Sequence, residues 1–345
     1  MQYDDLRILS QQSVIKPSEL IAALPLTFEA AKNINSAREI TTNIIEGHDP
    51  RLLVVVGPCS IHDYDSALDY AYHLKEAALR YSEKLFIIMR VYLEKPRTNL
   101  GWKGYINDPF LNGSSNINAG LELSRKLLLE LSTIGMPAAT EFLDTIIPQY
   151  LSDLISWTAI GARTSESQIH RELASGLSMP VGFKNTTDGN IQVAVDAAQT
   201  ARHPHHFLGI SKQGSPAIIN TTGNKAVHII LRGSHHSTNY TNKNVKLAVK
   251  ALTHANLTTR LMIDCNHGNS QKNHKRQFNV INSIIKQLEQ GKQNIMGVML
   301  ESHLIEGKQR IENNKALTYG QSITDGCISW RETEKILEKL AACEK

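Results

Sequence analysis

Eight ionisable or nucleophilic side chains end, or closely follow, apolar runs that are spread over the whole chain. In order they are Cys59, Arg90, Glu141, Arg163, Lys184, Arg232, His267 and Glu301. Cys59, His267 and Glu301 offer sulfur, nitrogen and oxygen donors, a mixed set that suits a divalent transition metal. A fourth ligand is expected after the last run, where Asp325 offers a carboxylate. The alternative thiolate is Cys265, two residues before His267.

Most of the remaining members of this set are cationic and predict a surface that binds anions. They are Arg90, Arg163, Lys184 and Arg232. They suit a small substrate with a phosphate and a carboxylate, because guanidinium groups bind both in a bidentate manner. A second basic loop, residues 94–104, predicts a second phosphate site or else a solvated lid. Two anionic pockets beside one metal favour an enzyme that joins two phosphorylated metabolites. A rim of structural salt bridges is the alternative, but it would need neither cysteine nor histidine.

Strands of a parallel sheet would have to bring these distant side chains together. Residues 52–56 are consecutive aliphatic residues closed by Gly57 and Pro58, which is typical of a strand buried on both faces. Similar runs precede the other members of the set, and each is followed by a helical pattern or by a segment long enough for a helix. This alternation predicts a (β/α)8 TIM barrel, in which active sites form at the carboxyl ends of the strands. No glycine-rich dinucleotide or P-loop fingerprint follows any run, which argues against an open doubly wound sheet.

Two parts of the chain fall outside this alternation. Residues 1–50 precede the first strand and predict an arm and a lead-in helix, so the barrel domain would span residues 51–345. Residues 205–210 and 216–220 are two β-like runs joined by a turn at Gly214, which predicts an antiparallel β-hairpin inserted within residues 203–226. The histidines at 203–206 and 235–236 are interpreted as exposed loop residues rather than metal ligands.

The composition argues against a nucleic-acid-binding or membrane protein. The chain has 345 residues, and its formal net charge of +4 is too small to indicate nucleic acid as a partner. No apolar run approaches the roughly 20 residues that cross a bilayer, and the N-terminus lacks the apolar core of a signal peptide. The four cysteines are too few for a disulfide framework in so long a chain. We therefore expect a cytoplasmic protein with reduced thiols.

Seven motifs closely resemble those of the type I 3-deoxy-D-arabino-heptulosonate 7-phosphate (DAHP) synthases. They are Gly57–Asp63, Glu94–Thr98, Gly101–Gly104, Ile160–Arg163, His170–Glu172, Pro180–Asn185 and Ser322–Asp325. The resemblance covers nearly the whole chain and implies a TIM barrel with an N-terminal extension and an inserted hairpin. It also implies the first reaction of the shikimate pathway, in which phosphoenolpyruvate condenses with D-erythrose 4-phosphate and water, and phosphate is released.

The resemblance implies a role for each matching side chain. A divalent ion (Mn, Fe, Co or Zn) would be bound by Cys59, His267, Glu301 and Asp325. Phosphoenolpyruvate would lie among Arg90, Glu141, Arg163, Lys184 and Arg232. Erythrose 4-phosphate would lie on Lys95, Pro96, Arg97 and Thr98, beside Asp325. Within these sets, Glu141 and Lys184 are candidates for positioning or activating the water, and Lys95 for stabilising the aldehyde oxygen.

The resemblance further implies feedback inhibition by an aromatic amino acid that binds between the protomers of a homodimer or homotetramer. The arm and the hairpin would be regulatory, and the matching positions are Asp5, Phe142, Pro148, Gln149, Leu177, Ser178, Phe207, Gly209 and Ile219. At the position of Gly209, phenylalanine-sensitive members resemble one another in carrying serine, and tyrosine-sensitive members in carrying glycine. A phenol oxygen needs room that a hydroxymethyl group would occupy, so tyrosine is the predicted inhibitor.

Several positions depart from the usual pattern of the family. Asn266 stands where serine usually precedes the histidine ligand, and Thr186, Ser165 and Gly326 replace glycine, threonine and alanine. None of these changes removes an expected ligand or anion contact. Two rival functions remain, namely condensation with arabinose 5-phosphate, as in 3-deoxy-manno-octulosonate 8-phosphate synthases, and a non-catalytic barrel that binds anions. The loop 95–98 argues against the first, and the complete set of strand-end residues argues against the second.

Overall fold

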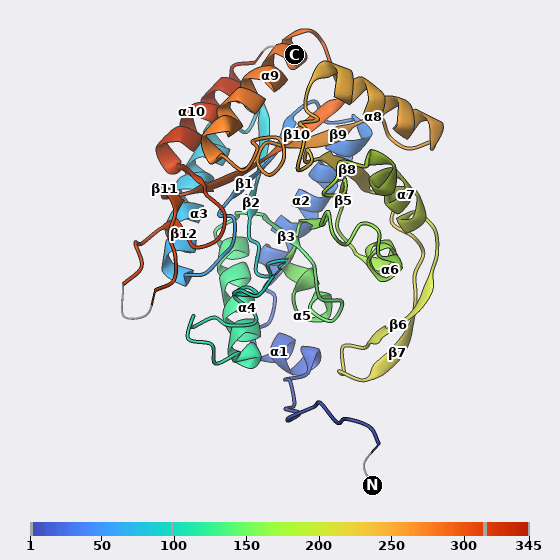
Figure 1. Ribbon diagram of the computed structural model, residues 1–345, viewed down its shortest axis with the longest axis vertical. Coiled ribbons are helices and arrows are strands. Elements are labelled where there is room, and N and C mark those ends of the chain that lie inside the picture. The colour runs from blue at the N-terminus through green and yellow to red at the C-terminus, as the bar shows by residue number, and fades with distance from the viewer. Residues whose placement is uncertain (1–2, 98, 313–315, 344–345) are drawn as a thin grey trace.

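The fold is a closed barrel of eight parallel strands with helices around it (Figure 1). The computed structural model describes residues 3–97, 99–312 and 316–343. The barrel strands are β1 (Leu52–Gly57), β2 (Leu85–Arg90), β3 (Ala138–Glu141), β4 (Trp157–Ile160), β5 (Val181–Lys184), β8 (Val227–Leu231), β9 (Leu261–Asp264) and β10 (Ile295–His303). The barrel closes between β1 and β10, where Gly57 lies beside Glu301. The predicted TIM barrel is therefore confirmed.

Burial on both faces explains the aliphatic composition of the strands. Every residue of β1 is buried. Successive side chains of a strand point to opposite faces. Accordingly Val54 and Val56 belong to the core shared with the surrounding helices, whereas Leu53 and Val55 belong to a separate core inside the barrel. A parallel sheet covered on both faces has no solvated side, so its strands are continuous apolar runs.

The helices around the barrel have clear sequence signals. They are α3 (Tyr64–Arg80), α4 (Ile117–Thr133), α6 (Gln168–Gly176), α7 (Ile191–Ala201), α8 (Asn242–His254), α9 (Gln277–Glu289) and α10 (Trp330–Ala341). In α3 the carboxylate of Asp63 accepts the backbone N–H of Ser66 at 2.8 Å, which satisfies a free donor at the start of the helix. Ala67, Ala71 and Leu74 recur at helical spacing and are buried against the barrel.

One predicted helix is wrong in extent. The sequence pattern over residues 150–156 predicts a helix, but α5 (Pro148–Leu151) ends early and only a 3-10 turn, Ser152–Leu154, follows. Arg38 donates from Nη2 to the carbonyl oxygens of Ser152 at 2.7 Å and Ile155 at 2.8 Å. Because these carbonyls are occupied by a guanidinium group, the chain turns directly into β4.

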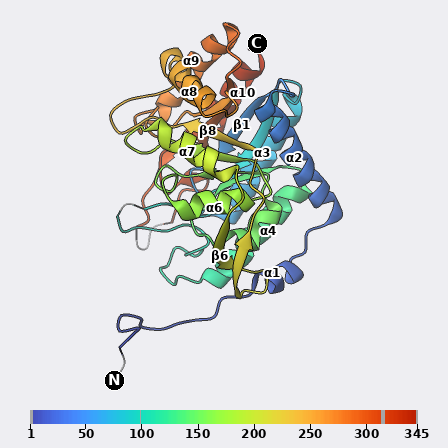
Figure 2. The same cartoon turned by 90° about the vertical axis from the view of Figure 1, so that its right-hand side faces the viewer.

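The N-terminal extension contains α1 (Pro17–Ala23) and α2 (Phe28–Glu46). The sequence pattern predicts that the lead-in helix spans residues 35–47. In the structure α2 begins at residue 28 instead, because the Thr27 hydroxyl caps it by accepting the N–H of Ala30. Ile44 and Ile45 of α2 pack on the inward-facing core of the barrel at its amino end, where Thr258, just before β9, donates to the carbonyl of Ile45. Residues 3–14 are exposed and extend away from the barrel (Figure 2).

The predicted hairpin is confirmed and consists of β6 (His206–Ile210) and β7 (Pro216–Asn220). In its antiparallel register Phe207 lies opposite Ile219 and Gly209 opposite Ala217. The turn of the hairpin contacts α1, since the backbone N–H of Ser18 donates to the carbonyl of Lys212 at 2.8 Å. The assignment of residues 1–50 and 203–226 to regulation remains a prediction.

The chain after β10 forms short pairings that the sequence did not predict. β11 (Ile305–Lys308) pairs with β12 (Gln321–Ser322), and β13 (Ile328–Ser329) pairs with the end of β10. These contacts hold the segment 321–329, which includes Asp325, against the last barrel strand. Within the described residues, none of the helices has the length and apolar character that a bilayer crossing demands.

Candidate active site

A cavity of about 350 Å³ opens at the carboxyl ends of the barrel strands. It is lined by residues from the loop after β2 and by strand-end residues, among them Lys95, Pro96, Arg97, Arg163, Arg232, His267 and Asp325. A smaller pocket of about 40 Å³ shares several of these residues and adds Glu141 and Lys184. The mouth therefore carries many cations in or near one space, which favours small anionic ligands.

Three of the four expected metal ligands form a compact donor group. Cys59, Glu301 and Asp325 each offer a ligand atom, and these atoms lie within 4.8 Å of one another. Cys59 follows β1 and Glu301 lies on β10, so the closure of the barrel between these strands brings the two together. Asp325 reaches them from the loop between β12 and β13, with Oδ2 3.7 Å from the Cys59 sulfur.

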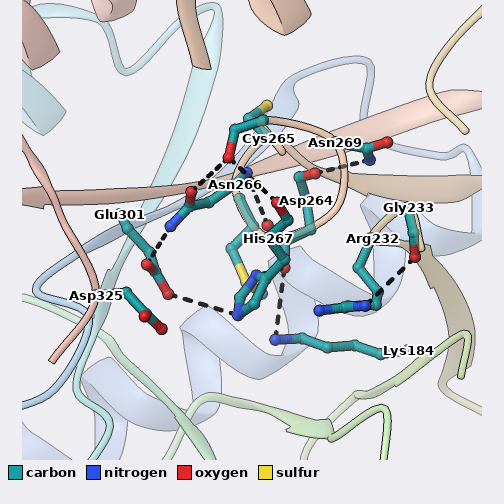
Figure 3. A network of polar contacts seen from close by, with 12 residues as sticks. Lys184, Arg232, Gly233, Asp264, Cys265, Asn266, His267, Asn269, Glu301 and Asp325 are labelled. Atoms are coloured by element: carbon teal, nitrogen blue, oxygen red, sulfur yellow. Dashed lines mark hydrogen bonds and ion pairs between the residues drawn. The ribbon is translucent and has the colours of Figure 1, made fainter. Parts of the chain in front are cut away.

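The fourth expected ligand, His267, lies beside this group (Figure 3). Its Nε2 is 3.8 Å from Oε1 of Glu301, and its Nδ1 is 2.8 Å from Oδ2 of Asp264. A carboxylate on one ring nitrogen fixes the tautomer and the orientation of a metal-binding histidine. The residues thus fit a divalent transition ion, because sulfur, nitrogen and two carboxylates converge and the imidazole is oriented from behind. Cys265, the alternative thiolate, lies instead in the core between barrel and helices.

The Cys59 thiol is held protonated until a cation compensates its charge. Burial, reinforced by the carboxylate of Glu301, raises its pKa, while the ammonium of Lys95, 3.1 Å from the sulfur, acts in the opposite direction. A metal ion binds the thiolate, so binding at this site would release a proton.

The buried cations of the mouth are paired with acids from neighbouring strands. Nη2 of Arg90 donates to Oε1 of Glu301 at 2.9 Å, and Nζ of Lys184 lies 3.3 Å from Oε2 of Glu141. Lys184 Nζ also lies 3.5 Å from Asp264 Oδ2. These pairs offset the cost of removing the charges from water. The salt bridges that the sequence allowed as an alternative are therefore present as well, and they support the charged side chains of the site.

Charge states in this network follow from the same pairs. Burial alone would raise the pKa of Glu141, but Lys184 and Arg90 outweigh it and hold the pKa below its usual range. Burial likewise opposes the charge of Lys184, yet Tyr92, Glu141 and Asp264 together raise its pKa. Glu141 is therefore a carboxylate that can accept a proton, and Lys184 is an ammonium that can only donate one.

The loop after β2 carries the four residues expected at erythrose 4-phosphate. Lys95, Pro96 and Arg97 line the cavity, whereas Thr98 lies outside the described residues. The backbone N–H of Lys95 donates to the carbonyl of Lys103 at 2.9 Å, which folds the loop back on itself. Glu94 anchors it by accepting the backbone N–H groups of Leu143 and Asp144, and burial raises the pKa of this carboxyl to about 8.

Four residues that the structure places at this site had no role there predicted from the sequence. They are Asp264, Asn266, His235 and Lys272. His235 is exposed, as predicted, but it stands on the wall of the main cavity. His235 and Lys272 follow strand-end residues by only a few positions, which was an available signal. The role of Asp264 depends on its contacts with His267 and Lys184, and these exist only in the folded barrel.

The residues expected to bind an inhibitor lie in two groups. Phe142 and Pro148 are buried after β3, and Gln149 is reached by Nζ of Lys212 from the hairpin turn, at 2.5 Å from its carbonyl oxygen. Phe207, Gly209 and Ile219 lie on one partly buried face of the hairpin, and Leu177 and Ser178 follow α6. Asp5 is exposed on the arm. The structure thus brings the hairpin to α5 and leaves the side chain of Asp5 exposed to solvent in the single chain.

The closed barrel with a charged cavity at its carboxyl end places the protein among the TIM-barrel enzymes. The family described as the DAHP synthetase I family matches residues 26–338, and the chain belongs to this family. The "Phospho-2-dehydro-3-deoxyheptonate aldolase, Phe-sensitive" of Escherichia coli (strain K12) is 51% identical over 100% of this chain and 98% of its own length. The Tyr-sensitive protein of the same organism is 49% identical over 98% and 95%. The Trp-sensitive one is 50% identical over 98% and 97%.

A solved structure agrees with this assignment. The phospho-2-dehydro-3-deoxyheptonate aldolase from Francisella tularensis SCHU S4 superposes with a TM-score of 0.96 at 51% identity, covering 97% of this chain and 98% of that one. The family that the sequence motifs suggested is thereby confirmed. Relatives with three different sensitivities match almost equally well, so overall identity does not distinguish between inhibitors.

Proposed function

We propose that this chain condenses phosphoenolpyruvate with D-erythrose 4-phosphate and water to give DAHP and phosphate, the first step of the shikimate pathway. The observation that carries the proposal is the convergence of Cys59, Glu301 and Asp325 within 4.8 Å beside a cavity rich in cations. Family membership supports the same reaction. The metal is proposed to be Mn, Fe, Co or Zn, held by these three residues and His267.

When bound, the divalent ion supplies a Lewis acid for the aldehyde oxygen of erythrose 4-phosphate. Arg163, Arg232 and Lys184 are proposed to hold the phosphate and carboxylate of phosphoenolpyruvate by charge-assisted hydrogen bonds. Lys95, whose ammonium lies 3.1 Å from the Cys59 sulfur, is proposed to donate to the aldehyde oxygen as negative charge develops there.

Glu141 is proposed as the base for the water that completes the reaction. The methylene carbon of phosphoenolpyruvate bonds to the aldehyde carbon, and positive charge develops at the carbon that carries the phosphate ester. Water then adds to this carbon, the carboxylate of Glu141 accepts its proton, and phosphate departs by C–O cleavage. The ammonium of Lys184, 3.3 Å from Glu141, keeps that carboxylate ionised and oriented for the transfer.

Tyrosine is the proposed feedback inhibitor. A Cβ added at Gly209 would lie 2.9 Å from Cγ1 of Ile219, so a hydroxymethyl group there would displace Ile219 and fill the space beside Phe207. Inhibition assays with each aromatic amino acid test this, and Gly209→Ser should weaken inhibition by tyrosine relative to phenylalanine. Inhibition of the wild type by phenylalanine alone would contradict it.

A homodimer or homotetramer in the cytoplasm is the proposed state of the protein. Leu208 and Ile218 lie opposite each other on the outer face of the hairpin and are 83% and 72% exposed, which leaves an apolar surface for another copy to cover. Analytical ultracentrifugation of the wild type and of a Leu208→Lys, Ile218→Lys variant measures this. A monomeric wild type would contradict the proposal.

The central experiment is a condensation assay with purified, metal-stripped protein. Phosphate release should require both phosphoenolpyruvate and erythrose 4-phosphate and should return when Mn²⁺ is added. Arabinose 5-phosphate in place of erythrose 4-phosphate should give little product, because the cavity wall is formed by Lys95, Pro96 and Arg97. Full activity after stripping would refute the metal role, and a preference for arabinose 5-phosphate would favour the sister reaction.

A further inference from the structure

Asn266 connects two buried groups behind the metal donors. Its side-chain Oδ1 accepts from the hydroxyl of Ser270 at 2.8 Å. Its Nδ2 donates to Oε2 of Glu301 (Figure 3). All three side chains are buried. The amide of Asn266 has one preferred orientation, because a flipped amide would place its oxygen against the carboxylate of Glu301, which can only accept.

This contact divides the two oxygens of Glu301 between different tasks. Oε2 is occupied by Asn266, whereas Oε1 accepts from Arg90 at 2.9 Å and lies 3.8 Å from Nε2 of His267. The backbone of Glu301 is fixed as well, because the amide of Gln277 accepts its N–H at 2.9 Å and donates to its carbonyl at 3.0 Å. The carboxylate is therefore held against rotation and offers Oε1 to the donor group.

We infer that Asn266 is a positioning residue that holds Glu301 as a single-oxygen ligand and so strengthens metal binding in this chain. The inference rests on the proposed metal site. An asparagine nitrogen lies one bond further from Cβ than a serine hydroxyl, so a serine at position 266 would not make this contact from the same backbone. Groups that hold a metal ligand from behind are typically worth about 10–100-fold in affinity.

A purely structural role for the Asn266 side chain is the competing explanation. The turn around it, however, is supported by backbone groups that any residue would retain. The N–H of Asn266 donates to Oδ1 of Asp264 at 3.0 Å, and its carbonyl accepts the N–H of Ser270 at 3.2 Å. The side chain thus contributes chiefly the link between Ser270 and Glu301, and its removal should affect the ligand more than the fold.

The test is the dissociation constant of Mn²⁺, measured on metal-stripped full-length protein by equilibrium competition with a chelator. We expect Asn266→Ser to raise this constant about 10–100-fold, and Ser270→Ala to raise it less. Asn273→Ser is the matched control, because it makes the same substitution in the same loop. Within the described part of the chain, the Asn273 side chain caps a turn by accepting the N–H of Lys275 and makes no other hydrogen bond. The control should bind Mn²⁺ as the wild type does.

Two further measurements on metal-free protein keep the result specific. The unfolding midpoint in denaturant and the affinity for phosphoenolpyruvate should be unchanged in Asn266→Ser. An unchanged Mn²⁺ constant, a wild type that binds no Mn²⁺, or a loss of affinity matched by a lower unfolding midpoint would overturn the inference. Condensation activity of the wild type is scored separately. An active wild type with no effect of Asn266→Ser refutes only the inference, and an inactive wild type with the expected effect refutes only the proposed reaction.

Discussion

The two ends of the barrel differ in what they bury. At the amino end, α2 places Ile44 and Ile45 on the inward-facing side chains of the strands, and the core there is apolar. At the carboxyl end, Arg90, Lys184 and Glu301 are almost completely buried and carry charge. Buried ions contribute little to stability even when paired, because desolvation offsets their attraction. The amino end is therefore built to hold the fold together, and the carboxyl end is built to bind.

The balance of charge at the carboxyl end points in the same direction. The lining of the main cavity includes Lys95, Arg97, Arg163, Arg232 and Lys272, with Asp325 as its acidic side chain. The innermost cations are neutralised by acids, as in the pair of Arg90 and Glu301, but the cations facing the cavity are in excess. Substrates with phosphate and carboxylate groups would complete the neutralisation.

Cys59→Ala, at the carboxyl end of the barrel, should have the largest effect of the predicted substitutions on condensation activity. We expect condensation activity below about 1% of the wild type, since even groups behind a ligand are worth up to 100-fold in metal affinity. The fold should persist, because the cysteine is small and lies at a strand end. Metal content and activity measure the effect. Cys265→Ala is the control and should keep both, so an active Cys59→Ala with an inactive Cys265→Ala would reverse the assignment.

Glu141→Gln, also at the carboxyl end, should cause the next largest loss of activity. It removes a proton acceptor but keeps the shape, and we expect kcat to fall by about 10²–10⁴ with the metal still bound. Steady-state kinetics measure it. Glu122→Gln is the matched control, because Glu122 is paired with Lys126 on the exposed face of α4. A kcat equal to that of the control would exclude Glu141 as the base.

Ile44→Ala tests the opposite end. Ile44 is fully buried where α2 closes the barrel, and we expect the free energy of unfolding to fall by about 2–5 kcal/mol. Because the substitution is at the amino end, kcat and the metal constant should not change. Denaturant titration and kinetics on one sample measure both. A large loss of kcat with normal stability would contradict the division between the two ends.

His228→Gln should have the smallest effect and tests the buried polar pair inside the barrel. His228 stacks on Trp157 and accepts its indole N–H at 3.0 Å, and burial lowers the histidine pKa from 6.5 to about 4. The unfolded chain therefore takes up a proton at higher pH than the folded chain does. Stability from this site is complete above pH 6.5 and decreases by about 3 kcal/mol as the pH falls to about 4.

The measurement for His228→Gln is the free energy of unfolding as a function of pH. The glutamine of the variant has no titrating group, so only the wild type loses stability at this site at low pH. The free energy of unfolding of the wild type minus that of the His228→Gln variant should therefore decrease as the pH falls from 6.5 to 4. Other titrating groups affect both proteins equally and cancel in that difference. Parallel curves over this range would show that His228 is not held neutral.

Local patterns were sufficient to predict the barrel and most of the strand-end residues. The run 52–56 could be identified as a buried strand because its residues are aliphatic and mostly β-branched, and the same argument placed Glu301 at the end of the last run. The prediction of a helix over residues 150–156 was wrong. Arg38, more than a hundred positions earlier in the chain, binds the carbonyl oxygens of Ser152 and Ile155, where the helix would have continued. No local pattern contains that contact.

The sequence by itself determined which strand-end side chains stand at the mouth, because strand periodicity and strand ends are properties of neighbouring residues. Only the tertiary structure decided how these side chains are paired. Asp264 orients His267, Asn266 holds Glu301, and His235 stands on the cavity wall. These relations depend on barrel closure and on the directions of side chains that are far apart in the chain, and a contact of a few ångströms between them is set by the packing of the whole barrel.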